Sequence, residues 1–385
     1  MSKIQVYHFH NGTAGGVLSV IRNLLRFSNN LQIENHIIYT INKESIPAYL
    51  LEPIAGAVTE QVFYYSPKWN FYFTCKQLAK LLPGKGAVIV AHDWLELGMA
   101  SQLGLQNRVV SFLHGDYDYY YQLAKLHAAS IDSFITIANN IAVKLKALLP
   151  AREKDIHYLR FPVPSFNYLK RSKSSNNIIF IGRLTEAKGY HLLPAIDSLL
   201  QSKNIFLNWH IIGDDNDKAG FGKSWNKNSL VQLYGAMDNA AVLSLLQSMD
   251  FFILPSMAEG MPVSLIESMK GGVIPLVNNI EGGIQELVID NETGFRIKNN
   301  DPADYVDRIT ALIQNTDLYN AIASNSIKKA NALFDPGENT HKIEVEICNV
   351  FSVPLKSKRA KRVYGSRLDQ KWLPNKFTKS VRNLK

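Results

Sequence analysis

The sequence predicts an α/β protein made of two doubly wound domains, each a parallel sheet with helices on both faces. Short apolar runs rich in β-branched and aromatic residues alternate with helix-like stretches along most of the chain. The alternation stops once, near residues 160–177, and then resumes. The length of 385 residues fits two domains, because single hydrophobic cores stop growing at roughly 250–300 residues.

Six apolar runs in the first half of the chain are predicted strands. They are Ile4–Phe9, His36–Ile41, Val62–Tyr65, Ala87–Ala91, Val109–Leu113 and Ser133–Ile137. The helix-like stretches between them include Val17–Phe27, Phe71–Leu82 and Asn140–Leu149. Strands that are apolar throughout and alternate with helices belong in a parallel sheet. We therefore predict an N-terminal domain over residues 1–165.

The pattern breaks in FPVPSFNYLKRSKSSNN, where prolines and a Ser/Asn/Lys cluster predict a linker over residues 166–176. Six more strands follow, at Ile178–Ile181, Phe206–Ile212, Leu230–Leu233, Phe251–Leu254, Val273–Val277 and Phe295–Ile297. They predict a second domain over residues 177–335. Helical stretches at about 301–315, 317–333 and 337–352 close the pattern. Residues 336–385 are expected to cross back towards the N-terminal domain.

The net charge of +9 resides in the C-terminal tail. Residues 356–385 contain eleven lysines and arginines against one acidic residue, Asp369, so the rest of the chain is close to neutral. A near-neutral body without a nucleic-acid-binding module argues against a nucleic-acid partner. Cys75 and Cys348 fit a reducing compartment. Because no secretory signal and no run of about 18 apolar residues is visible, the expected location is cytoplasmic.

Three loops that follow predicted strands carry candidate binding residues. The first, HNGTAGGVLSV, places Gly12, Gly15 and Gly16 between a strand and a helix. Glycines let the backbone approach a ligand, and free N–H groups at a helix start attract an anion or a polar group. A plain strand–helix turn is the alternative. The spacing is not GxGxxG, so NAD binding is not predicted.

The second loop, IGRLTEAKGYHLL, places Arg183 and Lys188 between a strand and a helix. Two cations at a helix start favour a diphosphate, because side-chain charge and helix dipole act together. A pair of solvated surface cations is the alternative.

The third loop, LPSMAEGMPVSLIESMKGGVIPL, contains two glutamates. Glu259 follows an apolar strand, and Pro262 suits the first helical position. Glu267 then lies about 7.5 Å further along the helix. The two carboxylates are therefore predicted to contact different parts of one elongated ligand, Glu267 accepting hydrogen bonds from a diol. They lie too far apart for the ~5–5.5 Å pair of a retaining hydrolase.

These motifs resemble the donor-binding domain of retaining GT-B glycosyltransferases of the family 4 type, the glycosyl transferases group 1. The matching strings, all in family order within residues 178–297, are GRLTEAKG, HIIGDD, LYG, FFILPSMAEGMPVSLIESMKGGVIPLV, EGGIQELV and NETGF. GGVLSVIRNLL and FLHGD resemble the family's acceptor domain more loosely. The resemblance implies a GT-B fold, in which two Rossmann-like domains face each other across a cleft. The first domain would bind the acceptor and the second the nucleotide sugar.

The resemblance also implies roles for single residues. Arg183 and Lys188 would hold the donor diphosphate, and Glu267 would contact the ribose. Glu259 would contact the transferred sugar, and His114 would lie near it; a core or capping histidine is the alternative for His114. Further donor-site residues are Gly15, Gly16, Gly213, Tyr234, Gly260, Met261 and Pro262. The string GDDND at 213–217 departs from the family, which more often has a second glycine there.

The implied reaction moves a hexose or N-acetylhexosamine from a nucleotide sugar, UDP by family default, to a glycan hydroxyl with retention of configuration. Cell-surface polysaccharide or lipopolysaccharide synthesis is the expected setting. Because the two cations already neutralise the diphosphate, no metal is expected, and the DxD strings Asp116–Asp118 and Asp215–Asp217 are interpreted as solvated or capping carboxylates. The alternatives are an epimerase-like GT-B enzyme and a non-catalytic scaffold that binds nucleotide sugars.

The basic tail predicts a membrane contact. After Pro374, which interrupts any long helix, Phe377, Val381 and Leu384 recur at helical spacing between basic residues. A basic amphipathic helix suits an anionic membrane surface, and would hold the enzyme peripherally on the inner face of the membrane, near a lipid-linked acceptor. The alternatives are packing on the N-terminal domain and a disordered tail. Membrane contact and packing can coexist, with Trp372 packed and the last helix facing outward.

Overall fold

A computed structural model describes residues 3–13, 15–45, 53–165, 176–214, 224–355 and 357–384. Nearly all of the predicted linker, and the second DxD string, lie outside these ranges. The chain forms two compact units: unit 1 comprises Met1–Pro162 and Pro336–Lys385, and unit 2 comprises Val163–Asp335.

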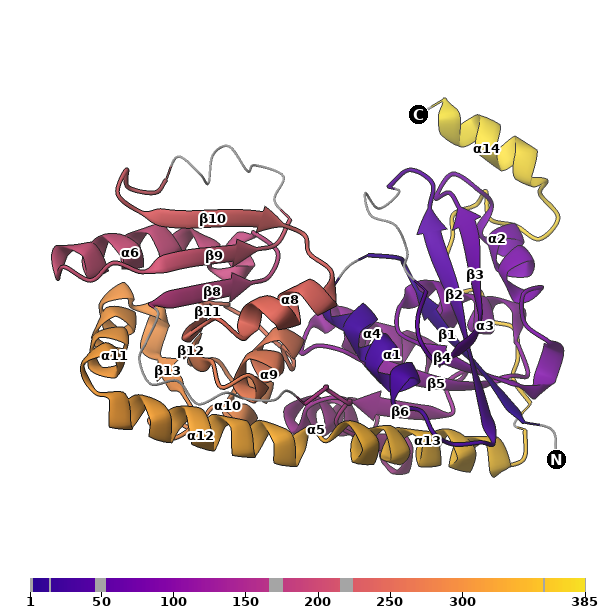
Figure 1. Cartoon of the computed structure of the whole chain (residues 1–385). Coiled ribbons are helices and arrows are strands. Elements are labelled where there is room, and N and C mark those ends of the chain that lie inside the picture. Colours follow the sequence, from indigo (N-terminus) through magenta and orange to yellow (C-terminus); the bar gives the residue numbers. More distant parts are fainter. Residues whose placement is uncertain are drawn as a thin grey trace. The chain divides into compact units, whose positions relative to one another are not determined.

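Unit 1 contains a parallel sheet of seven strands in the order β3-β2-β1-β4-β5-β6-β7 (Figure 1). The strands are β1 (Ile4–His10), β2 (Ile33–Asn42), β3 (Ala57–Tyr65), β4 (Ala87–Ala91), β5 (Arg108–Leu113), β6 (Ser133–Thr136) and β7 (Ile156–Tyr158). The helices include α1 (Gly16–Arg26), α2 (Phe71–Ala79), α3 (Trp94–Leu103), α4 (Asp118–His127), α5 (Asn139–Leu148) and α13 (Pro336–Ser352). All five residues of β4 are buried, as expected for a central strand.

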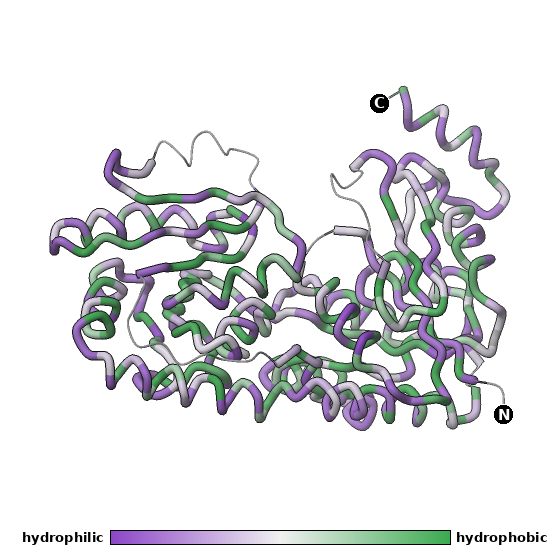
Figure 2. Tube along the Cα trace, in the orientation of Figure 1, coloured by the Kyte–Doolittle hydropathy of each residue, from purple (hydrophilic) through white to green (hydrophobic). Residues whose placement is uncertain are grey.

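Unit 2 repeats the arrangement with six parallel strands in the order β10-β9-β8-β11-β12-β13. They are β8 (Asn177–Ile181), β9 (Asn208–Ile212), β10 (Leu230–Gly235), β11 (Phe251–Leu254), β12 (Ile274–Asn278) and β13 (Phe295–Ile297). The helices include α6 (Leu193–Ser202), α8 (Asn239–Leu246), α9 (Val263–Lys270), α10 (Gly283–Leu287), α11 (Pro302–Gln314) and α12 (Thr316–Leu333). Figure 2, in the orientation of Figure 1, colours the chain by hydropathy; the central strand β11 consists of apolar residues only. The strand order reverses between β8 and β11, where doubly wound sheets bind ligands.

The predicted fold class is confirmed. Each predicted strand overlaps an observed one, although β3 begins five residues earlier and β9 two residues later than predicted. The three-residue β7 is too short to leave a sequence pattern. Helix α2 stops at Ala79 instead of Leu82. Pro262 is the N-cap of α9 in extended conformation, so the helix begins one residue later than predicted.

Helix α9 is fixed at its end by Lys270, whose side chain is fully buried. Its Nζ donates to the carbonyl oxygens of Val163, at 2.6 Å, and Phe334, at 2.8 Å. These residues lie where the chain enters and leaves unit 2. Burial lowers the pKa of Lys270 to about 8, while the nearby Asp335 acts in the opposite direction. The ammonium group thus ties α9 to both ends of the unit.

The C-terminal tail packs on unit 1. The buried Lys358 pairs with Asp132, with an Nζ–Oδ2 distance of 2.6 Å, and donates to the Asn107 carbonyl. Tyr364 packs edge-on against Phe71 and its hydroxyl lies 2.8 Å from Nε2 of His127. The expectation that Trp372 packs was wrong, because its side chain is 73% exposed. The last helix is α14 (Asn375–Asn383). None of the helices in the described residues combines the length and the apolar character needed to cross a bilayer.

Candidate functional site

The predicted cation and glutamate of unit 2 contact each other directly. Lys188 Nζ lies 2.5 Å from Glu259 Oε1, with only 18% and 7% of the two side chains exposed. The loop carrying Glu259 docks on the loop carrying Lys188, since the Met257 N–H donates to the Ala187 carbonyl. Gly189 makes this close approach possible: its φ is +71°, and a Cβ there would lie 2.1 Å from the Pro255 oxygen. Lys188 and Glu259 therefore act as one polar pair at the ends of β8 and β11.

The start of α9 lies beside the start of α10. A Cβ on Gly283 would lie 2.1 Å from the Gly260 carbonyl oxygen, so the two backbones touch. The first N–H groups of an α-helix have no acceptor within the helix, and α9 has no side-chain cap. Met261 is 4% exposed, and its side chain packs against Gly283 at the start of α10. The α9 terminus thus provides unpaired donors beside Glu259 for an anionic ligand.

Glu267 is the fifth residue of α9 and is 2% exposed. Burial raises its pKa to about 7, and a hydrogen bond from Asn239 opposes that rise. Asn239 Nδ2 donates to Glu267 Oε1 at 2.8 Å, which leaves Oε2 as an acceptor. Asn239 begins α8 and was not among the sequence candidates, because nothing in the sequence links it to a glutamate 28 positions away.

The other predicted donor-site residues have different environments. Arg183 is exposed directly after β8. Gly213 is required by packing, because a Cβ there would lie 1.9 Å from the Gly182 oxygen. Tyr234 is the penultimate residue of β10, and its hydroxyl lies 2.8 Å from His210 Nδ1, which fixes the ring. Together with the pair described above, these residues lie along the carboxyl ends of β8, β9, β10 and β11.

In unit 1, Gly15 and Gly16 are exposed at the start of α1. Gly15 is the N-cap with φ +149°, a conformation suited to glycine, and a Cβ there would meet no atom within 4 Å. The first turn of α1 contains no acidic residue. This helix start is therefore open to a polar or anionic ligand.

His114, which follows β5, ends a chain of histidines that the sequence did not reveal. His114 Nε2 lies 2.7 Å from His92 Nδ1, and His92 Nε2 lies 3.4 Å from His8 Nδ1. His8 Nε2 lies 3.3 Å from Asn35 Oδ1. Burial lowers the pKa of His114 to about 3 and that of His8 to about 4, so both rings are neutral at pH 7. His92, which lies between His8 and His114 in this chain, is 3% exposed.

The far end of this chain fixes the proton on each ring. Ser28 Oγ donates to Glu344 Oε1 at 2.5 Å, so its oxygen accepts from Asn35 Nδ2. The side-chain oxygen Oδ1 of Asn35 then faces His8 and accepts a hydrogen bond from its Nε2. Each neutral ring has one N–H and one acceptor nitrogen. His92 therefore donates to His8 and His114 donates to His92, which leaves His114 Nδ1 as an acceptor for a ligand hydroxyl.

Asp116, in the first DxD string, is held by protein groups. It accepts from Tyr121 through Oδ1, and from Asn140 Nδ2 and Lys144 Nζ at 2.7 Å each through Oδ2. This network gives it a structural role. Within the described ranges, no three His, Cys, Asp or Glu side chains are grouped so that they could hold a metal ion.

Comparison with known proteins identifies the domain that carries the Lys188–Glu259 pair. Residues 165–329 match the family model for glycosyl transferases group 1. WcaL of Escherichia coli (strain K12), which carries the name of a colanic acid biosynthesis glycosyltransferase, is 30% identical over 146 residues, 36% of each chain. An N-acetylgalactosaminyltransferase of Campylobacter jejuni, named for a diphospho-undecaprenol acceptor, is 26% identical over 40% of this chain and 39% of its own. The matched stretch thus spans little more than a third of these relatives.

Solved structures show the same fold over nearly the whole chain. The pneumococcal O-GlcNAc transferase GtfA, solved with UDP and GlcNAc, has a TM-score of 0.72 at 12% identity, over 91% of this chain and all of its own. HepE of Anabaena, solved with UDP and glucose, has a TM-score of 0.71 at 17% identity, over 90% of this chain and all of its own. The chain therefore has the two-domain GT-B fold, and its residues 165–329 match the model of the glycosyl transferases group 1 family.

Proposed function

We propose that this protein is a glycosyltransferase that moves a hexose or N-acetylhexosamine from UDP to a hydroxyl of a cell-surface glycan, with retention of configuration and without a metal. The observation that carries the proposal is the Lys188–Glu259 pair beside the open start of α9. Relatives named for colanic acid and for a diphospho-undecaprenol acceptor support a surface-polysaccharide role and a lipid-linked acceptor. Neighbours solved with UDP support UDP as the leaving group.

In this proposal the diphosphate takes the place of Glu259 as the partner of Lys188. Arg183 and the first N–H groups of α9 add to the stabilisation of the charge that grows on the leaving oxygen. Glu259, released from Lys188, accepts hydrogen bonds from hydroxyl groups of the sugar. The bond between the anomeric carbon and the phosphate oxygen breaks as the acceptor oxygen bonds to the same face, and the departing phosphate oxygen takes the acceptor's proton. No side chain is needed as a base.

The histidine chain gives His114 a defined part. Its Nδ1 is a neutral acceptor, so it can bind a sugar hydroxyl but cannot donate to a phosphate oxygen. Glu267 holds the ribose diol through Oε2, while Asn239 keeps Oε1 in place. Binding of the nucleotide and binding of the sugar thus depend on different carboxylates.

Calorimetry with UDP alone tests this division. Glu267→Ala is expected to weaken UDP binding, because the ribose contact needs no sugar, whereas Glu259→Ala should leave UDP affinity nearly intact and lower transfer from the UDP-sugar. Glu292→Ala removes an exposed glutamate of the same unit and serves as the control. The reverse pattern would overturn the two roles. UDP binding without transfer to any glycan acceptor would instead indicate a scaffold.

A further inference from the structure

Helix α14 is attached to unit 1 by polar side chains. Thr378 is fully buried, and its hydroxyl donates to the Leu368 carbonyl at 2.8 Å. Arg382 donates through Nη1 to the Trp69 carbonyl at 2.6 Å and through Nη2 to Asp369 Oδ2 at 2.6 Å. A surface helix normally turns its apolar side to the core; here a hydroxyl and a guanidinium hold the helix instead.

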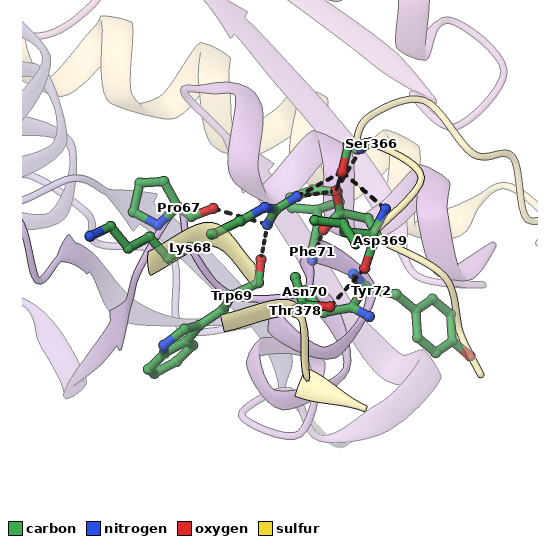
Figure 3. Close-up of polar contacts among 12 residues, drawn as sticks. Pro67, Lys68, Trp69, Asn70, Phe71, Tyr72, Ser366, Asp369 and Thr378 are labelled. Atoms are coloured by element: carbon green, nitrogen blue, oxygen red, sulfur yellow. Dashed lines mark hydrogen bonds and ion pairs between the residues drawn. The ribbon is translucent and has the colours of Figure 1, made fainter. Parts of the chain in front are cut away.

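The contacts around Asp369 make this attachment rigid (Figure 3). Asp369 is 2% exposed and accepts from the Phe71 N–H at 2.7 Å and the Ser366 N–H at 2.6 Å. Asn70 Nδ2 donates to the carbonyls of Gln370 and Leu373 at 2.9 Å each. Although burial opposes it, the hydrogen bonds from Arg382 and the two N–H groups hold the pKa of Asp369 below its usual range. The orientation of α14 is therefore set by the body of unit 1.

The apolar side of α14 consequently faces away from its attachment. At about 100° per residue, Phe377, Val381 and Leu384 form one stripe, more than a quarter turn from the stripe of Thr378 and Arg382. Phe377 is 53% exposed and Leu384 87% exposed. We call Phe377, Val381 and Leu384 the α14 apolar face; Trp372, 73% exposed, lies just ahead of the helix.

Basic side chains surround this face. At about 100° per residue, Lys376 flanks the α14 apolar face, Lys371 precedes the helix beside Trp372, and Lys379 projects from the opposite side of the helix. Lys371, Lys376 and Lys379 are exposed. Asp369 is the only acidic residue in 357–384, and it is buried against Arg382. A cationic zone with exposed aromatic and aliphatic side chains complements an anionic bilayer: lysines attract the lipid headgroups while Phe377 and Leu384 enter the interface.

We propose that the α14 apolar face, together with Lys371 and Lys376, is a docking surface for a lipid bilayer that contains anionic lipid. A nine-residue helix is too short to span the bilayer, so it lies in the interface plane. Because Asp369 and Arg382 fix α14 to unit 1, binding of the helix to the bilayer holds unit 1 at the membrane surface. The surface lies outside the candidate site, so the proposal does not depend on the glycosyltransferase activity.

Sedimentation of the full chain with vesicles tests the proposal without donor or acceptor. We expect binding to phosphatidylcholine vesicles that contain phosphatidylglycerol and little binding to phosphatidylcholine alone. Lys371→Gln/Lys376→Gln should weaken binding roughly 30-fold, because each lysine near an anionic surface strengthens it about fivefold. Phe377→Ser/Leu384→Ser should also reduce binding. All four residues are exposed, so circular dichroism and the Tm should stay at wild-type values.

Matched controls separate this surface from unspecific effects. Lys125→Gln/Lys154→Gln changes the net charge equally at exposed positions elsewhere on unit 1, and Leu31→Ser removes an 86% exposed leucine of that unit; both should bind like wild type. Equal binding by the α14 variants and the controls would overturn the proposal. A second result would also overturn it: the wild type is a dimer that does not bind vesicles, and Phe377→Ser/Leu384→Ser is a monomer. The α14 apolar face would then bind a second copy of the chain.

Discussion

Replacing Glu267 by glutamine should stabilise unit 2, and increasingly so as the pH rises. Glu267 is 2% exposed, and burial raises its pKa from 4.5 to about 7. An acid whose pKa is raised on folding favours the folded state only while protonated, so stability is lost as the pH rises from 4.5 through 7. At 1.36 kcal/mol per pKa unit, the raised pKa costs about 3 kcal/mol of stability above pH 8, where folded Glu267 is ionised. The cost is about 1 kcal/mol at pH 5, where folded Glu267 is protonated and the same side chain in the unfolded chain is already largely ionised. Glutamine keeps an oxygen that accepts from Asn239 but has no charge to bury.

The measurement is the free energy of unfolding of the wild type and of Glu267→Gln in urea at pH 5 and pH 8.5. Hydrogen exchange of the α9 and β11 amides reports the unfolding of unit 2. Other titrating groups cancel in the difference between the two proteins. The stability gain of Glu267→Gln should rise by about 2 kcal/mol between the two pH values. The same gain at both would show that Glu267 ionises without cost and would refute the argument from burial. Weaker UDP binding by the more stable variant is the expected trade between stability and function.

Four further outcomes follow from the fold and the proposed function. Gly213→Ala should lower the Tm of unit 2 markedly, since its Cβ would lie 1.9 Å from the Gly182 oxygen; an unchanged Tm would contradict that packing. Nitrogen-15 NMR should show His114 neutral from pH 5 to 8 with the proton on Nε2, and a proton on Nδ1 would invalidate the assigned direction of the histidine chain. Arg183→Ala and Lys188→Ala should each lower kcat/KM ~10²-fold or more. A chelator should leave the transfer activity of the wild type unchanged; loss of activity that Mn²⁺ restores would contradict the metal-free mechanism.

Sequence patterns predicted the sheets well because most of their strands are buried runs bounded by turn residues; the edge strands β3 and β10 are largely exposed. Ala87–Ala91 and Phe251–Leu254 were predicted to the residue. Helix α3 was harder: Leu95–Gln102 are all buried, so it has no polar side and no helical period to detect. The same holds for β7, where three residues carry no alternation.

Prediction of the site succeeded where function lies in local motifs and failed where it depends on distant contacts. Glu259 and Lys188 could be named because each lies in a recognisable strand–loop–helix segment. Their direct contact at 2.5 Å could not, because it depends on how two loops pack. The tail shows the same limit. The spacing of Phe377, Val381 and Leu384 indicated an amphipathic helix. The hydrogen bonds from Arg382 to carbonyl oxygens of loop 67–69 determine that the apolar side faces outward.

The histidine chain extends this reasoning from position to protonation. A lone His114 has two neutral tautomers, and its sequence neighbours favour neither. Glu344, 230 positions later on α13, accepts the single hydroxyl proton of Ser28, and that one choice sets the direction of every hydrogen bond back to His114. Because an acceptor nitrogen binds a sugar hydroxyl and a donor nitrogen binds a phosphate oxygen, the ligand chemistry at His114 is decided by a carboxylate that does not touch it. A substitution at Glu344 should therefore change the tautomer of His114 before it changes the fold around it.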